Sequence, residues 1–508
     1  MSFAEYVTQE DVVAALRGAV VGLVWVGGLF AAGPLTGGFG LIPLADFVIV
    51  TSPGWFAATM IDLLGFWAKP LLLGSLVAGA ALLAGGLGVV AARLSVVDDR
   101  ISSSVWVSSG VAVTCGLLAL GGVPLSAPMI TTALIAVFQA FLAGWILKSS
   151  STDTTSLQSR RSFAGRSLAI LGGATVSVGL FRATLDRIAG SRDSRTPDML
   201  PVAVSPPTGD PGFEFGEMPP AITSPADHYV IHKNVSPPSI DASEWQLTVS
   251  GAVSDPYELA YDDLLGHEKT VQQSMTMVCV SNEVGGDLIG TAHWTGVPLS
   301  ELVETAAPAD GTVDVVTHAA DGYSETFPIE QIRREDILLA YGMGDRTLRD
   351  KNGFPARLLI PGRYGMKMTK WIDEIELVES DRDGYWHERG WNEEAVLNTG
   401  SYIQSVTRDG QTVQIGGVAF GGLETQFEEI QAVEVSIDGG DSWNQATLES
   451  QLGPHMRRRW KHPVDVEAGT ELEIVCRTIR QDGSVQTADE TDPRPGGATG
   501  WHRVSETV

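Results

Sequence analysis

The sequence predicts a multi-domain protein with an N-terminal α-helical transmembrane region, a central α+β domain and a C-terminal β-sandwich. Three observations support this fold class. Long apolar runs occupy the first 150 residues, helix and strand patterns then mix as far as about Val378, and strand patterns alone follow from Val396. The length of 508 residues is sufficient for three or four domains of roughly 150 residues each.

The region 1–150 contains four stretches that are long and apolar enough to span a bilayer, which takes about 20 residues. Polar residues separate the stretches, and tryptophans fall near or within their ends, as interfacial aromatic residues often do. We therefore expect a four-helix transmembrane region in contact with membrane lipid. The predicted spans are residues 15–34, 70–92, 105–124 and 129–147.

No histidine precedes His228, and a haem between membrane helices is usually held by histidine. We therefore expect no haem in this chain. The four helices are predicted to anchor the protein or to dock another subunit, and a quinone site or a transport role is the alternative.

Residues 151–189 form a twin-arginine-like segment with a fifth apolar run, because Arg160 and Arg161 precede a stretch rich in glycine and alanine. A twin-arginine signal exports folded proteins, which suits a domain that acquires a cofactor before export. The alternative is that these arginines only anchor the helix on the cytoplasmic side. The expected location is the cell membrane, multi-pass, with the catalytic domain outside the cytoplasm.

Residues 190–223 are rich in Pro, Gly and Ser and are predicted to form a linker before the two domains at 224–395 and 396–508. Residues 201–508 carry 22 basic and 50 acidic side chains, which is most of the acidity behind the total net charge of −27. Such a surface repels nucleic acid, so a nucleic-acid partner is excluded. It fits a protein that works in high salt, and an ordinary acidic surface is the equal alternative.

Cys279 is the cysteine whose surroundings suggest chemistry. It follows an alternating strand and precedes a polar, Gly-rich turn, where a thiol can serve as a nucleophile or as a soft metal ligand. Cys115 lies in an apolar run, and Cys476 alternates with apolar residues in a strand, so both are expected to be buried small side chains. Three cysteines without a regular spacing do not indicate a disulfide framework.

A cationic segment at residues 354–371 stands out in this acidic half of the chain. It has four basic side chains and no acid, although a random exposed face here would be acidic. This composition suggests a buried anion site, in which Lys and Arg neutralise a phosphate, and internal ion pairing is the alternative. The four cations are Arg357, Arg363, Lys367 and Lys370.

A thiolate together with an anion-binding segment indicates a metal held largely by an organic, phosphate-bearing cofactor. Zinc fits less well, because it needs three or four Cys or His ligands at short spacing. His267 and His293 lie twelve or more residues from Cys279.

Several spaced motifs between about Tyr229 and Val508 resemble the sulfite oxidase family of molybdopterin-dependent oxidoreductases. Cys279 with Ser281-Asn282 is similar to the molybdenum-binding core of this family. Further similar segments are 294–299, 323–328, 338–341, 353–357, 361–362 and 365–371, and in the C-terminal region 435–443 and 497–502. The C-terminal segments resemble the immunoglobulin-like dimerisation domain of the family, which implies a possible homodimer.

The resemblance implies a role for each candidate residue. Cys279 would give its thiolate to molybdenum, and Tyr323 would lie near the oxo group. Three cations of the 354–371 segment, Arg363, Lys367 and Lys370, would bind the pterin phosphate. The remaining candidates for cofactor binding are His232, Lys233, Asn234, Asn282 and Arg357. A surface histidine at His232 and a core tyrosine at Tyr323 are the alternatives.

Two positions depart from the family pattern and bear on the substrate. Sulfite-oxidising members have arginines just after the cysteine motif, where this chain has Glu283 and Val284. A carboxylate there would repel sulfite, whereas a neutral sulfoxide would tolerate it. Residues 363–367 resemble the matching loop of methionine-sulfoxide-reducing relatives.

The sequence therefore predicts a membrane-anchored, outward-facing molybdopterin oxidoreductase. It would transfer an oxygen atom to or from a small sulfur oxyanion or sulfoxide in a two-electron reaction. With no haem in the chain, electrons would pass to or from a separate electron-transfer protein or membrane subunit. The alternatives are a non-catalytic membrane docking or assembly protein and a quinol-linked reductase subunit.

Overall fold

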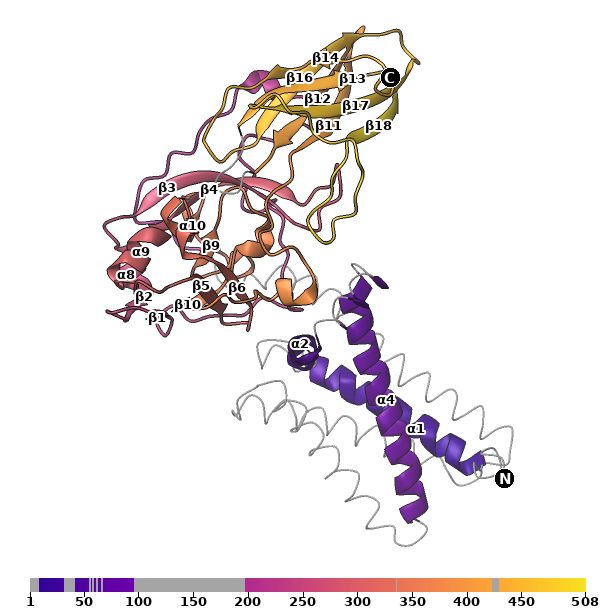
Figure 1. The fold of residues 1–508 in the computed structure, drawn as a ribbon. Coiled ribbons are helices and arrows are strands. Elements are labelled where there is room, and N and C mark those ends of the chain that lie inside the picture. The colour runs from indigo at the N-terminus through magenta and orange to yellow at the C-terminus, as the bar shows by residue number, and fades with distance from the viewer. Residues whose placement is uncertain are drawn as a thin grey trace. The chain divides into compact units, whose positions relative to one another are not determined.

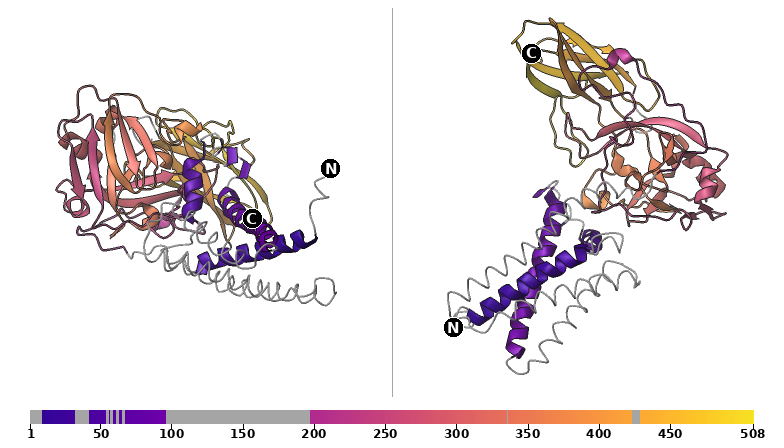
Figure 2. Two further views of the ribbon diagram at one scale, coloured as in Figure 1. Left: turned by 90° about the horizontal axis from the view of Figure 1, so that it is seen from below. Right: turned by 180° about the vertical axis from the view of Figure 1, so that it is seen from behind.

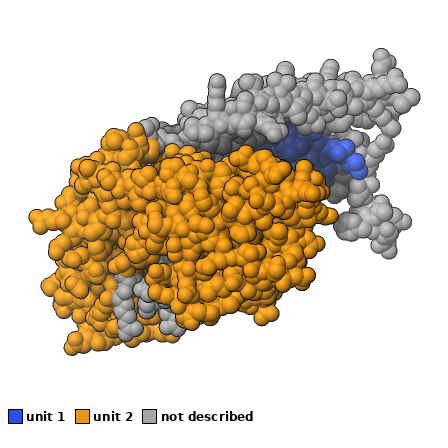
Figure 3. Space-filling view, turned by 90° about the horizontal axis from the view of Figure 1, so that it is seen from above, with its two compact units in different colours: residues 1–192, 233–236 blue, residues 193–232, 237–508 orange. Residues whose placement is uncertain are grey.

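The structure is a computed structural model, and the chain divides into two compact units (Figure 3). The first unit comprises residues 1–192 and 233–236, and the second comprises residues 193–232 and 237–508. The residues that the structure describes are 9–31, 42–53, 56, 59–60, 63–64, 67–95, 197–334, 336–422 and 429–508.

The described part of the first unit is helical, with α1 (Gln9–Ala31), α2 (Ile42–Thr51) and α4 (Ala68–Ser95) (Figures 1 and 2). Helices α1 and α4 pack against each other. A Cβ atom added at Gly22 would lie only 2.7 Å from Cβ of Ala84, so the missing side chain of this glycine permits the close approach of the two helices.

The predicted N-terminal transmembrane region is wrong for the part of the chain that the structure describes, where no helix has the length and apolar character needed to cross a membrane. Helix α2 has ten residues and is therefore about 15 Å long, half of a hydrocarbon core of about 30 Å. Charged residues at Glu10, Asp11 and Arg17 interrupt α1, and glycine and alanine make up much of α4. The apolar runs that lie in the described ranges therefore form helices that are too short or not apolar enough to cross a membrane.

Several other predictions concern residues 96–196, which lie outside the described ranges. These are the spans at 105–124 and 129–147, the twin-arginine-like segment at 151–189 and the burial of Cys115.

The second unit begins with an irregular segment that contains the short helix η4 (Pro211–Phe213). The segment lies along the C-terminal sandwich, where the carbonyl groups of Asp210 and Pro219 accept hydrogen bonds from the guanidinium of Arg459 at 3.1 and 3.4 Å. The later part of the predicted linker is therefore held against a folded domain.

The α+β part of the second unit contains two sheets and short helices (Figure 1). The first sheet has the order β2-β1-β10-β5-β6. Strands β1 and β10 pair in parallel although about 120 residues separate them, with Thr248 opposite Glu374, whereas the other pairs are antiparallel. The strands are β1 (Gln246–Gly251), β2 (Tyr257–Ala260), β5 (Asp314–Ala319), β6 (Ser324–Pro328) and β10 (Ile372–Val378), and the helices are α8 (Tyr261–Leu265), α9 (Leu299–Thr305) and α10 (Ile329–Arg334).

The second sheet has the order β3-β4-β7-β8, and β9 also pairs with β7. Its central strand β4 is buried along nearly its whole length, with Trp294 fully inaccessible. This sheet positions Cys279, which follows directly on the last residue of β3. The strands are β3 (Val271–Val278), β4 (Ile289–Pro298), β7 (Leu338–Met343), β8 (Arg346–Thr347) and β9 (Arg357–Leu359).

Two antiparallel four-stranded sheets form the C-terminal part, with orders β11-β12-β16-β15 and β14-β13-β17-β18. One apolar core lies between them and includes Ile415, Trp460, Val433 and Cys476, so the predicted β-sandwich and the burial of Cys476 are confirmed. Its immunoglobulin-like character stays a prediction. The strands are β11 (Gly400–Asp409), β12 (Thr412–Phe420), β13 (Ile430–Ser436), β14 (Asn444–Gln445), β15 (Thr447–Leu448), β16 (Arg458–Asp465), β17 (Glu471–Arg480) and β18 (His502–Thr507).

Candidate active site

Cys279 follows directly on β3, whose last five residues are all buried, and it precedes a tight turn. Its amide donates to the carbonyl of Leu288 at 3.0 Å, and its own carbonyl accepts from the amide of Asn282 at 3.0 Å. The side chain is 7% exposed. The backbone on both sides of the thiol is therefore fixed, while the side chain is almost closed to bulk water.

The electrostatic surroundings of this thiol act in opposite directions. Burial raises the pKa of Cys279, because a thiolate loses its hydration inside the protein. Hydrogen bonds from Ser281 and the positive charge of Lys370 lower the pKa again. A cationic metal would favour the thiolate further, as metals do with coordinating thiols. The site therefore suits a thiolate whose charge is balanced by a bound group.

Asn282 holds the turn after Cys279 in place. Its side-chain oxygen accepts from the Leu288 amide at 2.9 Å, and its amide nitrogen donates to the hydroxyl of Tyr402 at 3.3 Å. Tyr402 lies on β11, so this residue links the cysteine turn to the sandwich. The structure thus places Asn282 beside the site in a positioning role, and its predicted contact with the cofactor stays a prediction.

Arg357 is a buried cation that lacks a carboxylate partner among the described residues. It is 5% exposed, and it donates to the Asn352 carbonyl at 3.2 Å and lies 5.4 Å from the ring centroid of Trp294. Burial lowers its pKa to about 10. An Arg fork usually pairs with a carboxylate or phosphate when it is removed from water. The missing anion is therefore consistent with a site for a bound phosphate.

Other buried polar atoms around Arg357 also have no hydrogen-bond partner within the described part of the chain. His228 stacks on Tyr229 with ring centroids 5.1 Å apart and meets the edge of Trp294 at 6.0 Å. Such atoms are rare in folded proteins and cost free energy unless a ligand or water satisfies them. The partnerless atoms of this group are His228 Nε2, Tyr229 Oη, Trp294 Nε1, Asn352 Oδ1 and Arg357 Nε.

This polar group adjoins the cysteine. Burial raises the pKa of Tyr229, the charge of Cys279 adds to this rise and the charge of Arg357 lowers the pKa, so the tyrosine is within electrostatic range of both the thiol and the guanidinium. Sequence reasoning missed His228, Tyr229 and Trp294 as site residues. Only the absence of earlier histidines drew attention to His228, and nothing in the local pattern marks the other two.

Lys367 forms an internal ion pair with Glu325. Its ammonium donates to Glu325 at 2.8 Å and to the carbonyl of Thr326 at 2.6 Å, and both side chains of the ion pair are at most 3% exposed. The alternative of internal ion pairing therefore describes this lysine in the present structure. Its predicted role in binding phosphate would require an exchange of partners.

The carboxylate of Glu325 also accepts a hydrogen bond from Tyr323. The tyrosine hydroxyl donates to Glu325 at 2.9 Å and lies 2.5 Å from the carbonyl of Met366. Burial and the charge of Glu325 raise the pKa of Tyr323 well above its usual value, so the hydroxyl keeps its proton. Glu325 thus joins the predicted substrate-site tyrosine to Lys367.

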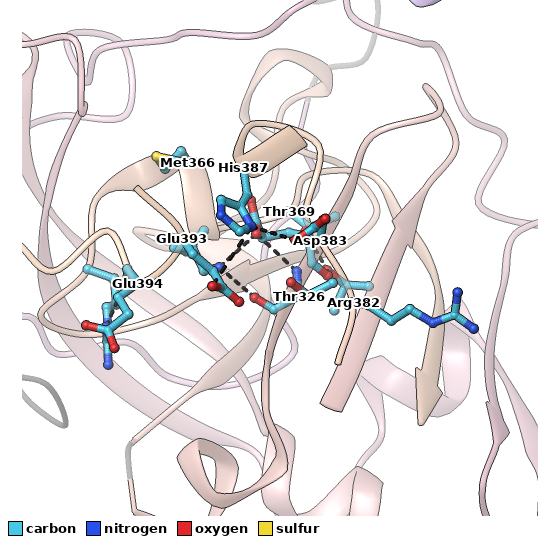
Figure 4. A network of polar contacts seen from close by, with 12 residues as sticks. Thr326, Met366, Thr369, Arg382, Asp383, His387, Glu393 and Glu394 are labelled. Carbon is cyan, nitrogen blue, oxygen red and sulfur yellow. Dashed lines mark hydrogen bonds and ion pairs between the residues drawn. The ribbon is translucent and has the colours of Figure 1, made fainter. Parts of the chain in front are cut away.

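Figure 4 shows Thr326 and Met366 of this network and, close by, His387 pointing toward Asp383 and Glu393. His387 lies 2.8 Å from Asp383 and 3.9 Å from Glu393. These acids follow the cationic segment in sequence, and their ion-pair partner is His387.

Lys370 and His232 both contact Trp371. The Lys370 ammonium lies 4.4 Å from the ring centroid of Trp371 and donates to the carbonyl groups of Ile231 and Lys351 at 2.9 and 3.3 Å. The His232 ring meets the same indole edge-on at 5.9 Å. The structure thus brings together two predicted residues that are 138 positions apart.

The remaining predicted cofactor residues are Arg363 in the second unit and Lys233 and Asn234 in the first. The guanidinium of Arg363 donates to the carbonyl of Glu394 at 2.8 Å, which ties the cationic segment to the chain before β11. Lys233 and Asn234 belong to the first unit, where their side chains bond each other at 3.1 Å and the Asn234 carbonyl accepts from Lys69 at 2.9 Å. Their predicted contact with a cofactor stays untested.

Residues 233–386 match the family described as oxidoreductase molybdopterin binding domain. The chain contains a molybdopterin-binding oxidoreductase domain. The predicted molybdenum-dependent oxidoreductase and its molybdopterin cofactor are thereby confirmed. The partnerless polar atoms near Cys279 fit this cofactor, because a pterin has many hydrogen-bonding atoms and a phosphate that suits Arg357.

Curated relatives agree with this assignment. The chain is 26% identical to sulfite oxidase of Gallus gallus, over 55% of this chain and 72% of that protein. It is 27% identical to mitochondrial sulfite oxidase of Homo sapiens, over 53% and 58%, and 25% identical to an NADH nitrate reductase of Brassica napus, over 45% and 31%. The chain thus spans only about a third of the plant nitrate reductases that it matches.

A solved structure shares the fold. The sulfane dehydrogenase SoxCD from Paracoccus pantotrophus superposes with a TM-score of 0.51 at 21% identity, covering 61% of this chain and 87% of that chain.

Proposed function

We propose that this protein performs a two-electron oxygen-atom transfer on a small sulfur oxyanion or sulfoxide, with Cys279 as the thiolate ligand of molybdenum. The relatives named sulfite oxidase and the structural neighbour named sulfane dehydrogenase support sulfur chemistry. The relatives named nitrate reductase show that related domains also serve other oxyanions.

The observation that carries the proposal is the group of partnerless polar atoms beside a nearly closed thiol. Tyr229 Oη and Arg357 Nε are buried without a hydrogen-bond partner among the described residues, and Cys279 interacts electrostatically with Tyr229. A cofactor with a phosphate and a polar ring would satisfy these atoms, and the metal would take the thiolate. Buried polar groups without partners lower the free energy of unfolding, so we would not expect a protein that no longer binds the cofactor to retain them.

Three residues of this chain would bind the cofactor, adjust the charge of the thiol or contact the reacting atoms. Arg357 would neutralise the phosphate, and Lys370 would lower the proton affinity of the thiol. Tyr323, fixed by Glu325, would offer a protonated hydroxyl near the reacting atoms. The bound cofactor would supply the reversible two-electron chemistry, and electrons would be exchanged with a separate redox protein. Homodimer formation and a location outside the cytoplasm stay predictions.

Metal and pterin analysis of protein matured in a host that makes molybdopterin tests the proposal. We expect about one molybdenum and one pterin per chain, together with turnover of sulfite or of a sulfoxide in assays with redox dyes. Protein without molybdenum from such a host would refute it.

Replacement of the thiol tests the ligand. Cys279→Ser should retain the fold and the pterin but lose turnover by a factor of at least about a hundred, because a hydroxyl is a poor soft ligand. Cys476→Ser is the matched control, because Cys476 is also buried but lies in the sandwich core, where its thiol donates to the Ser401 carbonyl at 3.2 Å. Full activity of the first variant would show that another residue is the ligand.

A further inference from the structure

A small cavity lies where the cysteine turn, the cationic segment and the sandwich meet. Its volume is about 10 Å³, which is room for roughly one water-sized group. The cysteine turn contributes Val284, the cationic segment contributes Tyr364, and the remaining lining residues follow position 397. They are Asn398, Thr399, Gly400, Tyr402, Phe420, Gln486, Ala498, Thr499 and Gly500.

The cavity lies beside the strand end that carries the candidate metal ligand. Val278 and Val280, which flank Cys279 in sequence, pack in one apolar cluster with the lining residues Tyr364 and Tyr402. Burial raises the pKa of Tyr364 and the charge of Cys279 adds to this rise, so the thiol is within electrostatic range of the lining.

Two hydroxyl groups in the lining can donate a hydrogen bond. The Tyr364 hydroxyl accepts from the amide of Asn398 at 3.3 Å, and the Tyr402 hydroxyl accepts from the side chain of Asn282 at 3.3 Å. Burial raises the pKa of Tyr364 to about 12 and raises that of Tyr402 as well, so both hydroxyls keep their protons. Each hydroxyl accepts one bond in these contacts and still has a proton to donate.

Among the residues that the structure describes, those that line the cavity carry no charge. Val284 faces the cavity, whereas Glu283 is exposed and is not part of the lining. Discrimination against sulfite at this cavity would therefore depend on Val284, which lines it, rather than on the Glu283 carboxylate. An apolar side chain and two neutral donors cannot offset the desolvation of a dianion, because a buried charge needs an opposite charge.

We propose that this cavity receives the oxygen end of the substrate and selects an uncharged sulfoxide over sulfite, through the hydroxyls of Tyr364 and Tyr402 and the apolar wall of Val284. The proposal rests on the proposed function and specifies the substrate class of that site. A sulfoxide oxygen is a strong neutral acceptor of about the size that the cavity admits.

The implied reaction is the reduction of a sulfoxide to a sulfide. The sulfur–oxygen bond breaks, sulfur gains two electrons, and the oxygen leaves as water after taking up two protons. An external electron donor supplies the electrons, and reduced viologen serves as that donor in the assay.

The first test compares substrates with the purified holoenzyme. We expect kcat/KM for viologen-linked reduction of a dialkyl sulfoxide to exceed kcat/KM for dye-linked oxidation of sulfite by at least about tenfold. Equal or greater efficiency with sulfite would overturn the proposal.

The second test introduces a charge into the cavity wall. Val284→Arg should lower kcat/KM with the sulfoxide and lower KM for sulfite, each by about tenfold, because a cation would now balance the anion. Val284→Gln is the control of similar polarity without charge, and it also serves if the arginine variant fails to fold. It should not gain sulfite affinity, and an equal gain in both variants would contradict a charge-based selection.

The third test removes one donor at a time. Tyr402→Phe and Tyr364→Phe should each lower kcat/KM with the sulfoxide about five- to tenfold, chiefly through KM, as expected for one neutral hydrogen bond. Tyr257→Phe is the matched control, because this half-buried tyrosine bonds the Leu302 carbonyl in another part of the unit. Unchanged kinetics in both cavity variants would refute the assignment.

Failure of this proposal differs from failure of the proposed function. If the molybdenum-containing protein prefers sulfite, or if Val284→Arg leaves the kinetics unchanged, only the cavity assignment is refuted. Protein without molybdenum, or without turnover of any sulfur substrate, would remove the proposed function itself.

Discussion

Two buried arginines in the second unit have opposite surroundings. Arg459 in the sandwich is 1% exposed and meets Glu449 through two bonds of 2.7 Å. Arg357 in the α+β part is 5% exposed, and its contacts are a carbonyl and the face of Trp294. The first charge is neutralised within the protein, whereas the second has no anion among the described residues.

The difference separates a structural charge from a charge that awaits a ligand. A buried ion pair satisfies both partners, so the removal of one partner is costly. A buried cation without an anion already carries a desolvation cost that only a bound anion can offset. We therefore expect mutations at the two arginines to affect different properties, and the predictions below are ranked by their effect on the free energy of unfolding.

Arg459→Met should have the largest effect on stability. It leaves the Glu449 carboxylate buried without its partner and removes the hydrogen bonds to Asp210 and Pro219, which should cost roughly 3–5 kcal/mol. The midpoint of urea unfolding measures this loss. Molybdenum content of the protein that remains folded should not change, and a selective loss of molybdenum would contradict the structural role.

Lys367→Met should also destabilise the protein, by about 3 kcal/mol, because Glu325 would then be buried without its ammonium partner. The double variant Lys367→Met/Glu325→Gln should recover much of this loss, since the buried charge is gone. Urea unfolding of both variants gives the comparison. If the single variant instead keeps its stability and loses pterin, Lys367 binds the phosphate as the resemblance implies.

His228 should make stability depend on pH. Burial lowers its pKa from 6.5 to about 4, so the folded protein holds this imidazole neutral. The lowered pKa of His228 contributes up to about 3 kcal/mol to the free energy of unfolding. This contribution is complete above pH 6.5 and is lost as the pH falls toward 4. His228→Gln should remove this part of the acid sensitivity in urea unfolding at pH 7 and 4.5. An identical loss of stability in both proteins would show that other groups dominate.

Arg357→Met should destabilise the protein least and lower cofactor content most. Removal of an unneutralised buried cation should not lower the free energy of unfolding of the cofactor-free protein, because the desolvation cost of the cation disappears with it. Molybdenum and pterin content should fall at least about tenfold, because the phosphate loses its partner. Metal analysis beside urea unfolding tests both parts, and full cofactor content would show that Arg357 is not the phosphate ligand.

Local patterns predicted much of the second unit. The alternation in residues 274–278 placed Cys279 at a strand end, and the strands after Val396 formed the expected sandwich. The N-terminal prediction failed because it relied on the length of apolar runs. Helices α1 and α4 do form over most of the runs at 15–34 and 70–92, but α2 is short, α1 is charged near its start and α4 is rich in small residues, and no described helix is long and apolar enough to cross a membrane. An apolar run that forms a helix is therefore not by itself a membrane span.

The sequence by itself determined the type of chemistry, because a lone thiol at a strand end and an acid-free cationic segment are both local features. Only the tertiary structure decided which cation is neutralised. Glu325 lies 42 residues before Lys367, and His228 and Tyr229 lie far from Arg357, so no local pattern reveals these contacts. Charge pairing inside a protein depends on distance in space and on loss of water, and both arise only when the strands assemble.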